Sequence, residues 1–249
     1  MVSSDVWDDD TAATYDQISA DMFRPEVVEP AVQLLSDYAG SGPALAFAIG
    51  TGRLAIPLAR LGIPVTGIDL SPAMVAQLRT KASADEIPAV TGDMATTVVP
   101  GQFSLVFLPF NSLSNLRTQD EQVACFRNAA RHLRDGGYFV VELFVPQLRR
   151  LPPGQFTVPF ALDDDHLGFD TLDTVSQECR SHHYVRQADG SFRYNVGNFR
   201  YAWPSECDLM ARMAGMEIVA RFGDWDRSPF TAGSDKHISV WRKPPHLER

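Results

Sequence analysis

The residues best suited to chemistry are a glycine turn and a carboxylate that follows it along the chain. Gly50-Thr51-Gly52-Arg53 comes directly after a short apolar run, and Asp69 ends the next apolar run. Glycines let the backbone pass close to a ligand, and a helix that begins there offers free amides and positive potential. An ionised carboxylate at a strand end can accept hydrogen bonds from both hydroxyls of a ribose. The pattern predicts a site for an adenosine-containing ligand, with a tight turn and an N-capping aspartate as the alternative interpretation.

Two cofactors satisfy this pattern, NAD and S-adenosylmethionine. Gly50, Gly52 and Ala55 even fit the Gly-x-Gly-x-x-Ala fingerprint of dinucleotide-binding folds. Asp93 and Met94 favour S-adenosylmethionine, because they follow the predicted third strand, where a carboxylate can accept from the adenine amine while the thioether packs on the ring. A Leu-Arg-Asp-Gly-Gly-Tyr turn before the predicted fifth strand and two strands that close the sheet after a last helix favour it too.

Together these motifs resemble the class I S-adenosylmethionine-dependent methyltransferases. The family's first motif, an acidic residue and then Gly-x-Gly-x-Gly, aligns with AFAIGTG at 46–52, and its second motif with GIDLSPAM at 67–74. The third matches GDM at 92–94, and the segment after the fourth strand matches LPFNS at 108–112. The resemblance is close over residues 15–145 and looser over residues 205–249. This chain departs from the family pattern at Ala46, where the family has an acidic residue that helps orient the methionine end of the cofactor, and at Ala48, which replaces the first glycine.

The resemblance implies a role for each part of the cofactor site. Asp69 would hold the ribose, Asp93 and Met94 the adenine, and Phe110 the methionine region. The cofactor would lie across the carboxyl ends of the strands, as ligands in open α/β sheets usually do. The full set of expected cofactor-binding residues is Gly50, Thr51, Gly52, Arg53, Asp69, Leu70, Met74, Asp93, Met94 and Phe110.

The acceptor pocket is expected between the N-terminal helix, the loop after the fourth strand and a later insertion. Tyr15 is the aromatic residue that lies beside the methyl group in similar small-molecule methyltransferases, and helix packing is its alternative role. His182 and His183 are adjacent on a predicted strand, so at most one of them faces the pocket, where a neutral histidine can take the acceptor's proton. A surface or packing role is the alternative for either histidine. Further acceptor-site candidates are Asn111, Tyr184, Arg200, Tyr201, Trp203, Trp225 and Asp226.

Alternating strands and helices must position these residues. Apolar runs at 44–49, 65–68, 87–90, 104–108 and 138–145 predict five strands, and intervening helices are expected over 54–61, 71–81 and from Thr118 to a stop at Gly136-Gly137. Helices are also expected at 15–23, 25–38 and 205–214, antiparallel strands at 192–203, and closing strands at 216–222 and 237–242. The fold class is therefore α/β: a Rossmann-like doubly wound seven-stranded sheet with an antiparallel β insertion after the fifth strand.

We expect a single methyltransferase domain over residues 1–249, built in four parts. These are an N-terminal helical cover at 1–40, a cofactor-binding α/β core at 41–147, a β insertion that covers the substrate at 148–203, and a return to the core sheet at 204–249.

Composition limits the partners. The net charge is −9 and no basic stripe occurs, which argues against nucleic acid. The acidic N-terminus lacks the features of a secretory signal, and the apolar run at 139–145 is interrupted by Glu142 and too short to span a membrane. Three widely spaced cysteines indicate reduced thiols in a cytoplasmic protein, which we expect to be a monomer or homodimer. The acidic run at 163–166 is expected to be a solvated loop, with no metal bound.

The sequence therefore predicts an S-adenosylmethionine-dependent enzyme that methylates an oxygen or nitrogen atom of a small molecule, such as a natural-product intermediate. Two alternatives share the same turn and aspartate. One is an NAD-dependent oxidoreductase, and the other is a non-catalytic ligand-binding domain of the same fold.

Overall fold

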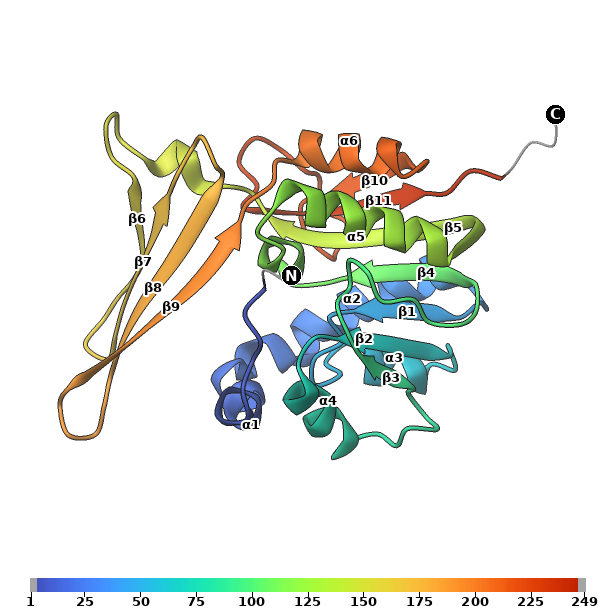
Figure 1. Cartoon of the computed structure of the whole chain (residues 1–249), viewed down its shortest axis with the longest axis horizontal. Coiled ribbons are helices and arrows are strands. Elements are labelled where there is room, and N and C mark those ends of the chain that lie inside the picture. Colours follow the sequence, from blue (N-terminus) through green and yellow to red (C-terminus); the bar gives the residue numbers. More distant parts are fainter. Residues whose placement is uncertain (1–3, 246–249) are drawn as a thin grey trace.

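A seven-stranded sheet forms the centre of the protein, in a computed structural model that describes residues 4–245 (Figure 1). The strand order is β10-β11-β5-β4-β1-β2-β3. All neighbouring strands are parallel except at β11, which is antiparallel to both β5 and β10. The strands are β1 (Ala44–Phe47), β2 (Val65–Asp69), β3 (Ala89–Thr91), β4 (Phe103–Leu108), β5 (Leu133–Phe144), β10 (Glu217–Phe222) and β11 (Lys236–Arg242). The doubly wound seven-stranded sheet predicted from the sequence is confirmed.

Helices cover both faces of this sheet and bury two apolar clusters. On one face, α2 (Pro25–Ala39) and α3 (Ala55–Arg60) contribute Leu34, Leu35 and Leu58, each less than 2% exposed. On the other face, α5 (Gln119–His132) and α6 (Pro204–Met213) contribute Phe126 and Met210. The sheet is thereby shielded from water on both sides, as a parallel sheet requires.

Local signals fix several helix ends. Thr118 caps α5 in a capping box with Glu121, as predicted. Ser71 caps α4 (Pro72–Arg79), where its hydroxyl accepts a hydrogen bond from the Met74 N–H at 3.2 Å. Ser71 lies directly beyond the carboxyl end of β2, so its cap also fixes the start of a segment that lines the site.

Two expected boundaries are wrong. The helix expected at 15–23 is α1 (Asp9–Ile18) followed by a separate 3₁₀ turn, η1 (Ala20–Phe23), because Asp8 caps the earlier start by accepting from the Thr11 N–H. The helix before the fifth strand ends at His132, and the glycine pair expected to stop it lies inside β5. Gly136 has φ +78°, and a Cβ on Gly137 would lie 2.9 Å from the Arg134 carbonyl oxygen, so these glycines permit a bend within the strand.

The insertion after β5 is a four-stranded antiparallel sheet in the order β6-β7-β8-β9 (Figure 1). Its strands are β6 (Thr157–Leu162), β7 (His166–Leu172), β8 (Glu178–Arg186) and β9 (Phe192–Arg200). Short 3₁₀ turns, η2 (Ser112–Asn115) and η3 (Gln147–Arg150), lie near its base. No helix within residues 4–245 is long and apolar enough to cross a membrane.

Candidate active site

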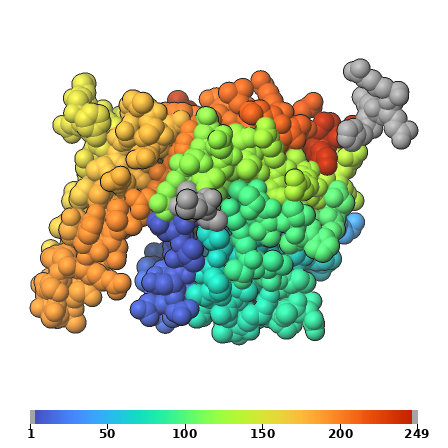
Figure 2. All heavy atoms as spheres, viewed as in Figure 1, coloured from blue at the N-terminus to red at the C-terminus, as the bar shows by residue number. Residues whose placement is uncertain are grey.

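A cavity of about 560 Å³ lies between the carboxyl ends of the core strands and one face of the insertion. Its walls come from the N-terminal segment, the turns after β1, β2, β3 and β4, the end of β5, and strands β7 to β9. The β8–β9 hairpin stands beside the N-terminal helix in the space-filling view (Figure 2). The three parts of the chain from which the sequence predicted an acceptor pocket therefore meet at one hollow.

Asp69 joins the first two turns of the core. Its carboxylate accepts from the Gly50 N–H at 2.7 Å and from the Ser71 N–H at 2.9 Å, one bond on each oxygen. Burial raises the pKa of this carboxyl, and the two backbone N–H groups lower it in part. Each oxygen keeps a lone pair for a ligand hydroxyl. The geometry therefore suits the predicted ribose contact.

The glycine turn needs its glycines. Gly50 has φ +58° and Gly52 has φ +91°, conformations that cost little only for glycine. A Cβ on Gly52 would lie 2.5 Å from a methyl group of Leu78. The turn thus brings backbone close to the cavity, where Gly50 is part of the wall.

The residues expected around the adenine line the same cavity. Leu70, Met74, Asp93 and Met94 all contribute to its wall. Met74 and Met94 are almost fully buried, and Asp93 holds its own turn through the Ala95 N–H at 2.8 Å. The structure brings these residues together with Asp69, although they come from turns after different strands.

A second hollow of about 60 Å³ lies next to the turn and receives Arg53 and Thr51. The Arg53 guanidinium lies 5.9 Å from the centre of the Phe110 ring, and burial lowers the pKa of Arg53 while the Glu142 carboxylate acts in the opposite direction. Ala46, which replaces the family's acidic residue, also lines this hollow. The Arg53 side chain, from the turn after β1, thus lies in the same hollow as Ala46, where the first motif of the family has an acidic residue.

Glu142 is a site residue that the sequence analysis missed. It is 4% exposed, accepts from the Phe110 N–H at 2.8 Å, and pairs with Lys236 at 3.3 Å. Phe110 and Asn111 both have positive φ, +50° and +56°, which non-glycine residues rarely adopt. Glu142 therefore holds a strained turn that presents Phe110 to the cavity. Its only sequence signal was a lone acid in a buried apolar run.

The N-terminal cover closes the cofactor side. Tyr15 lines both hollows, and its ring packs edge-on against Trp7 with the ring centres 5.2 Å apart. Burial raises the pKa of Tyr15, so the phenol stays protonated at neutral pH. The Thr51 hydroxyl donates to Asp16 at 2.6 Å, and the Ser71 hydroxyl donates to the Trp7 carbonyl oxygen at 2.6 Å. These bonds tie the cover to the turns that it encloses.

The two faces of the insertion separate the adjacent histidines, as predicted. His183 lines the cavity, whereas His182 turns away, where it lies 3.1 Å from the Thr171 hydroxyl and 2.7 Å from the Tyr194 hydroxyl. Burial lowers the pKa of His183 and the neighbouring His166 lowers it further, which keeps this imidazole neutral near pH 7. Other insertion residues in the cavity wall include Asp170, Leu172, Cys179, Ser181, Phe199 and Tyr201.

Five expected acceptor-site residues lie outside the cavity wall, so these expectations are corrected. Tyr184 is on the outer face of the insertion, where its ring packs against that of Tyr194 with the ring centres 4.8 Å apart. Trp203 is the N-cap of α6, and Trp225 is buried in the core of the α/β unit. The Asp226 side chain is exposed and accepts from the Ser228 N–H. The Trp203 ring packs edge-on against Tyr201 from outside the cavity, with the ring centres 6.3 Å apart. The two other candidates, Asn111 and Tyr201, do line the cavity.

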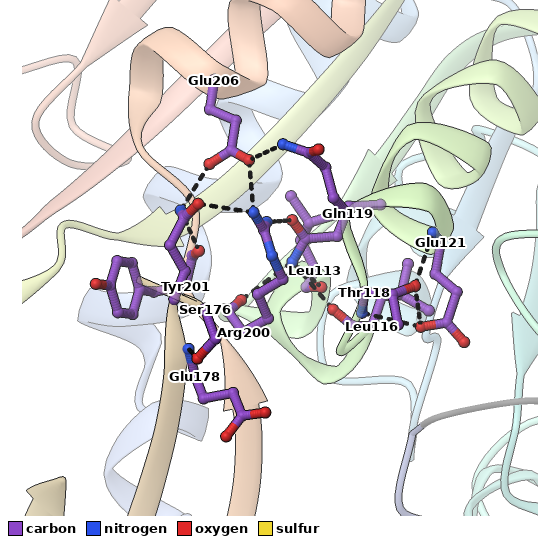
Figure 3. A network of polar contacts seen from close by, with 12 residues as sticks. Leu113, Leu116, Thr118, Gln119, Glu121, Ser176, Glu178, Arg200, Tyr201 and Glu206 are labelled. Atoms are coloured by element: carbon purple, nitrogen blue, oxygen red, sulfur yellow. Dashed lines mark hydrogen bonds and ion pairs between the residues drawn. The ribbon is translucent and has the colours of Figure 1, made fainter. Parts of the chain in front are cut away.

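Arg200 is the fifth expected acceptor-site residue that lies outside the cavity wall. It joins the insertion to the core. It donates to Glu206 at 2.8 Å, to Gln177 at 2.8 Å and to Gln122 at 2.6 Å, and it is only 5% exposed (Figure 3). All three partners lie away from the cavity wall. Its charge is therefore used to anchor the base of β9 to α5 and α6.

Comparisons with known proteins give one consistent result. A family model described as a methyltransferase domain matches residues 44–137. The cypemycin N-terminal methyltransferase of a Streptomyces species is 26% identical over 96% of this chain and 98% of its own length. The structure of the CcbJ methyltransferase from Streptomyces caelestis is 37% identical with a TM-score of 0.84, over 94% of this chain and 96% of that chain. CalS10, an amino pentose methyltransferase from Micromonospora echinaspora with S-adenosylmethionine bound, shares the fold at 20% identity and a TM-score of 0.70, over 96% of this chain and 98% of that one.

Proposed function

The chain belongs to the class I S-adenosylmethionine-dependent methyltransferases, and we propose that it methylates an oxygen or nitrogen atom of a small molecule such as a natural-product intermediate. Family membership excludes the two alternatives that the sequence left open, an NAD-dependent oxidoreductase and a non-catalytic domain. The acceptor and the roles of individual residues are the new part of this proposal.

The observation that carries the proposal is the single cavity of about 560 Å³, whose walls combine the cofactor turns with the inner face of the insertion. Cavities of roughly 300–1,000 Å³ suit small ligands. The insertion and the N-terminal cover restrict access to this one, which favours a small acceptor over a folded protein or a nucleic acid.

The proposed division of labour follows the four parts of the chain. The core at 41–147 binds the cofactor, with Asp69 on the ribose and Asp93, Met94, Leu70 and Met74 around the adenine. Arg53, which lines the second hollow, would bind the methionine carboxylate. The cover at 1–40 and the insertion at 148–203 enclose the acceptor, and 204–249 completes the sheet.

Methyl transfer mainly requires that the acceptor atom is aligned with the methyl group and that water is excluded from the site. Bound S-adenosylmethionine supplies a methyl group already activated by a sulfonium. Tyr15, Phe110 and the turn held by Glu142 would fix the position of the acceptor relative to that methyl group. Their aromatic surfaces keep water from the reacting centre, where positive charge is redistributed. His183, the one histidine of the adjacent pair in the wall, is the candidate that takes the acceptor's proton.

The names of two relatives support nitrogen as one of the acceptor atoms. The cypemycin enzyme is an N-terminal methyltransferase, and CalS10 acts on an amino pentose. CalS10 is also described as involved in calicheamicin biosynthesis, which supports a natural-product acceptor here.

A screen of candidate acceptors with isotopically labelled S-adenosylmethionine tests the proposal. Each reaction is followed by mass spectrometry of the products, and S-adenosylhomocysteine binding is measured by calorimetry alongside. We expect label in a small molecule. Tight S-adenosylhomocysteine binding with label appearing only in added protein or nucleic acid would refute the small-molecule acceptor.

A further inference from the structure

The wall of the main cavity carries an unbalanced charge. Four carboxylates line it, from Asp5, Asp69, Asp93 and Asp170, and within residues 4–245 no lysine or arginine side chain does. A cleft lined by one sign of charge concentrates ligands of the other sign. The positive charge of the cofactor's sulfonium would offset part of this negative charge. The Arg53 guanidinium does not, because Arg53 lines the separate second hollow. Negative potential therefore remains at the acceptor end.

Three of these carboxylates have hydrogen-bond or ion-pair partners that account for their presence in the wall. Asp69 accepts two backbone N–H groups and Asp93 accepts one. Asp5 pairs with Arg117. Asp69 and Asp93 lie on the cofactor side of the cavity, in the core turns, and Asp5 lies in the N-terminal segment, where it also accepts from the Asn198 side chain at 3.5 Å. Asp170 lies on the opposite wall, in β7 of the insertion, where the proposed cofactor roles do not use it.

Asp170 is fixed in place by its neighbours on the inner face. It is directly opposite Ser181 in the β7–β8 register, where the Ser181 hydroxyl lies close enough to lower the pKa of the Asp170 carboxyl. The Ser181 oxygen lies 3.2 Å from His183 Nε2, and His183 Nδ1 lies 2.9 Å from His166 Nε2. These four side chains form a row that runs from the cavity toward the β6–β7 turn.

The electrostatic setting of Asp170 is that of a carboxylate lacking a counter-ion. Burial raises the pKa of Asp170, and this effect exceeds the lowering by the Ser181 hydroxyl, His183, His182 and Arg150. The Arg150 guanidinium donates a hydrogen bond to the Pro159 carbonyl oxygen. A cation placed in the cavity would stabilise the ionised form of Asp170 and be held by it.

We propose that the acceptor is a basic amine and that Asp170 is the carboxylate that binds its nitrogen. The inference rests on the proposed function and narrows its oxygen-or-nitrogen acceptor to a nitrogen that is cationic in water. Ser181 and His183, which also line the cavity, act as positioning residues for Asp170, and His183 takes the acceptor's proton through Asp170 and Ser181 instead of directly.

The proton balance of the reaction fits this arrangement. The bound ammonium gives one proton to the Asp170 carboxylate, which leaves a nitrogen lone pair free to attack. The new N–CH₃ bond forms as the S–CH₃ bond breaks, leaving neutral S-adenosylhomocysteine and a methylated ammonium product. The proton on Asp170 leaves through the Ser181–His183–His166 row, in which each group has both a hydrogen and a lone pair.

Two matched probes test the amine preference in the protein loaded with S-adenosylhomocysteine. Benzylamine and benzyl alcohol have the same ring and carbon but differ in charge at neutral pH. By calorimetry we expect benzylamine to bind at least about tenfold more tightly, since charge-assisted hydrogen bonds are the stronger kind. Equal affinities, tighter binding of the alcohol, or no binding of either probe would overturn the inference.

Asp170→Asn assigns the preference to one residue. It should abolish the difference between the probes while leaving S-adenosylhomocysteine affinity within about twofold, because the adenosine contacts come from the core. Asp164→Asn is the control, since it removes an exposed carboxylate from the same sheet at the β6–β7 turn and should keep the preference. A preference that survives Asp170→Asn refutes the assignment.

The labelled-cofactor screen separates this inference from the proposed function. If S-adenosylhomocysteine binds and label enters only hydroxyl groups of small molecules, the methyltransferase proposal stands and the amine inference fails. If label never enters a small molecule, both fail. Label on an amine that Asp170→Asn turns over with a raised KM supports both.

Discussion

The two walls of the cavity are built in different ways. The cofactor wall consists of turns at the ends of parallel strands, where backbone N–H groups and Asp69 hold one another within 3 Å. The acceptor wall is one face of an antiparallel sheet, made of side chains such as Asp170 and His183. Substituting a side chain on that sheet leaves the backbone pairing of the insertion intact. The cofactor wall tolerates change poorly, because moving one turn moves its neighbours.

This difference indicates how one fold can keep a cofactor and change its acceptor. The insertion is anchored away from the cavity, where Arg200 meets Glu206 and Gln122 (Figure 3). Its inner face can therefore vary without loss of its attachment to the core. Substitutions in the two walls should therefore have separable effects on cofactor affinity, stability and turnover.

The largest effect is expected from Asp69→Ala in the cofactor wall. The substitution removes the proposed ribose contact and frees the Gly50 and Ser71 N–H groups, so S-adenosylhomocysteine affinity should fall at least about a hundredfold, or about 3 kcal/mol. Calorimetry measures the affinity, and circular dichroism verifies the fold. Asp85→Ala, on an exposed turn, is the control. Unchanged affinity would contradict the ribose assignment.

The sequence predicts the cofactor wall better than the acceptor wall, because the first is built from local turns and the second from side chains of a sheet. The glycine turn, Asp69 and the Thr118 cap were predictable because each depends on residues close together in the chain. Asp170 was missed because its face depends on the β7–β8 register, and Glu142 because its partners Phe110 and Lys236 are distant in sequence. Trp225 and Arg200 have residue types common in pockets, yet packing against other elements buries both. Long-range packing was the missing information in each case.

The second effect is a pH dependence of stability that belongs to the core. His237 in β11 has no exposed surface, and burial, with Arg221 nearby, lowers its pKa to about 3. The unfolded chain takes up this proton below about pH 6.5 while the folded protein does not, so the free energy of unfolding falls as pH decreases from 6.5 toward 3. The slope contributed by this one group is up to about 1.4 kcal/mol per pH unit.

Urea unfolding at pH 7, 6 and 5 measures that slope. His132 and His183 also have lowered pKa values and add slopes of the same sign, so the variant His237→Gln is needed to isolate one group. We expect a shallower slope in His237→Gln, whatever its stability at pH 7. An identical slope in the variant would assign the acid sensitivity to other groups.

The third effect concerns the junction between the walls. Glu142→Ala leaves the Phe110 N–H without its acceptor and Lys236 without one of its two carboxylates, which should cost about 2 kcal/mol of stability. The 110–111 turn should relax from its positive φ values, so kcat should fall more than S-adenosylhomocysteine affinity does. Urea unfolding, calorimetry and labelled methyl transfer measure the three quantities.

The variant Glu142→Gln distinguishes a role of Glu142 in positioning the 110–111 turn from a role in stability alone. The amide oxygen can still accept from Phe110, so kcat should recover most of its value even though the ion pair with Lys236 is lost. If Glu142→Gln and Glu142→Ala reduce kcat equally, the hydrogen bond to Phe110 does not position the turn.

The smallest effect is expected from Tyr15→Phe, where the cover meets both walls. Losing one neutral hydrogen bond is worth about 1 kcal/mol, so kcat should fall about fivefold if the hydroxyl acts on the acceptor, while S-adenosylhomocysteine affinity stays nearly unchanged. The Ser19 side chain lies close enough to this hydroxyl to lower the pKa of Tyr15, which offers a matched control. Ser19→Ala removes that polar neighbour and leaves the phenol in place, so it should lower kcat less than Tyr15→Phe does. Equal losses in the two variants would mean that the hydroxyl only holds the cover together, and the Tyr15 ring would then contribute through packing against Trp7.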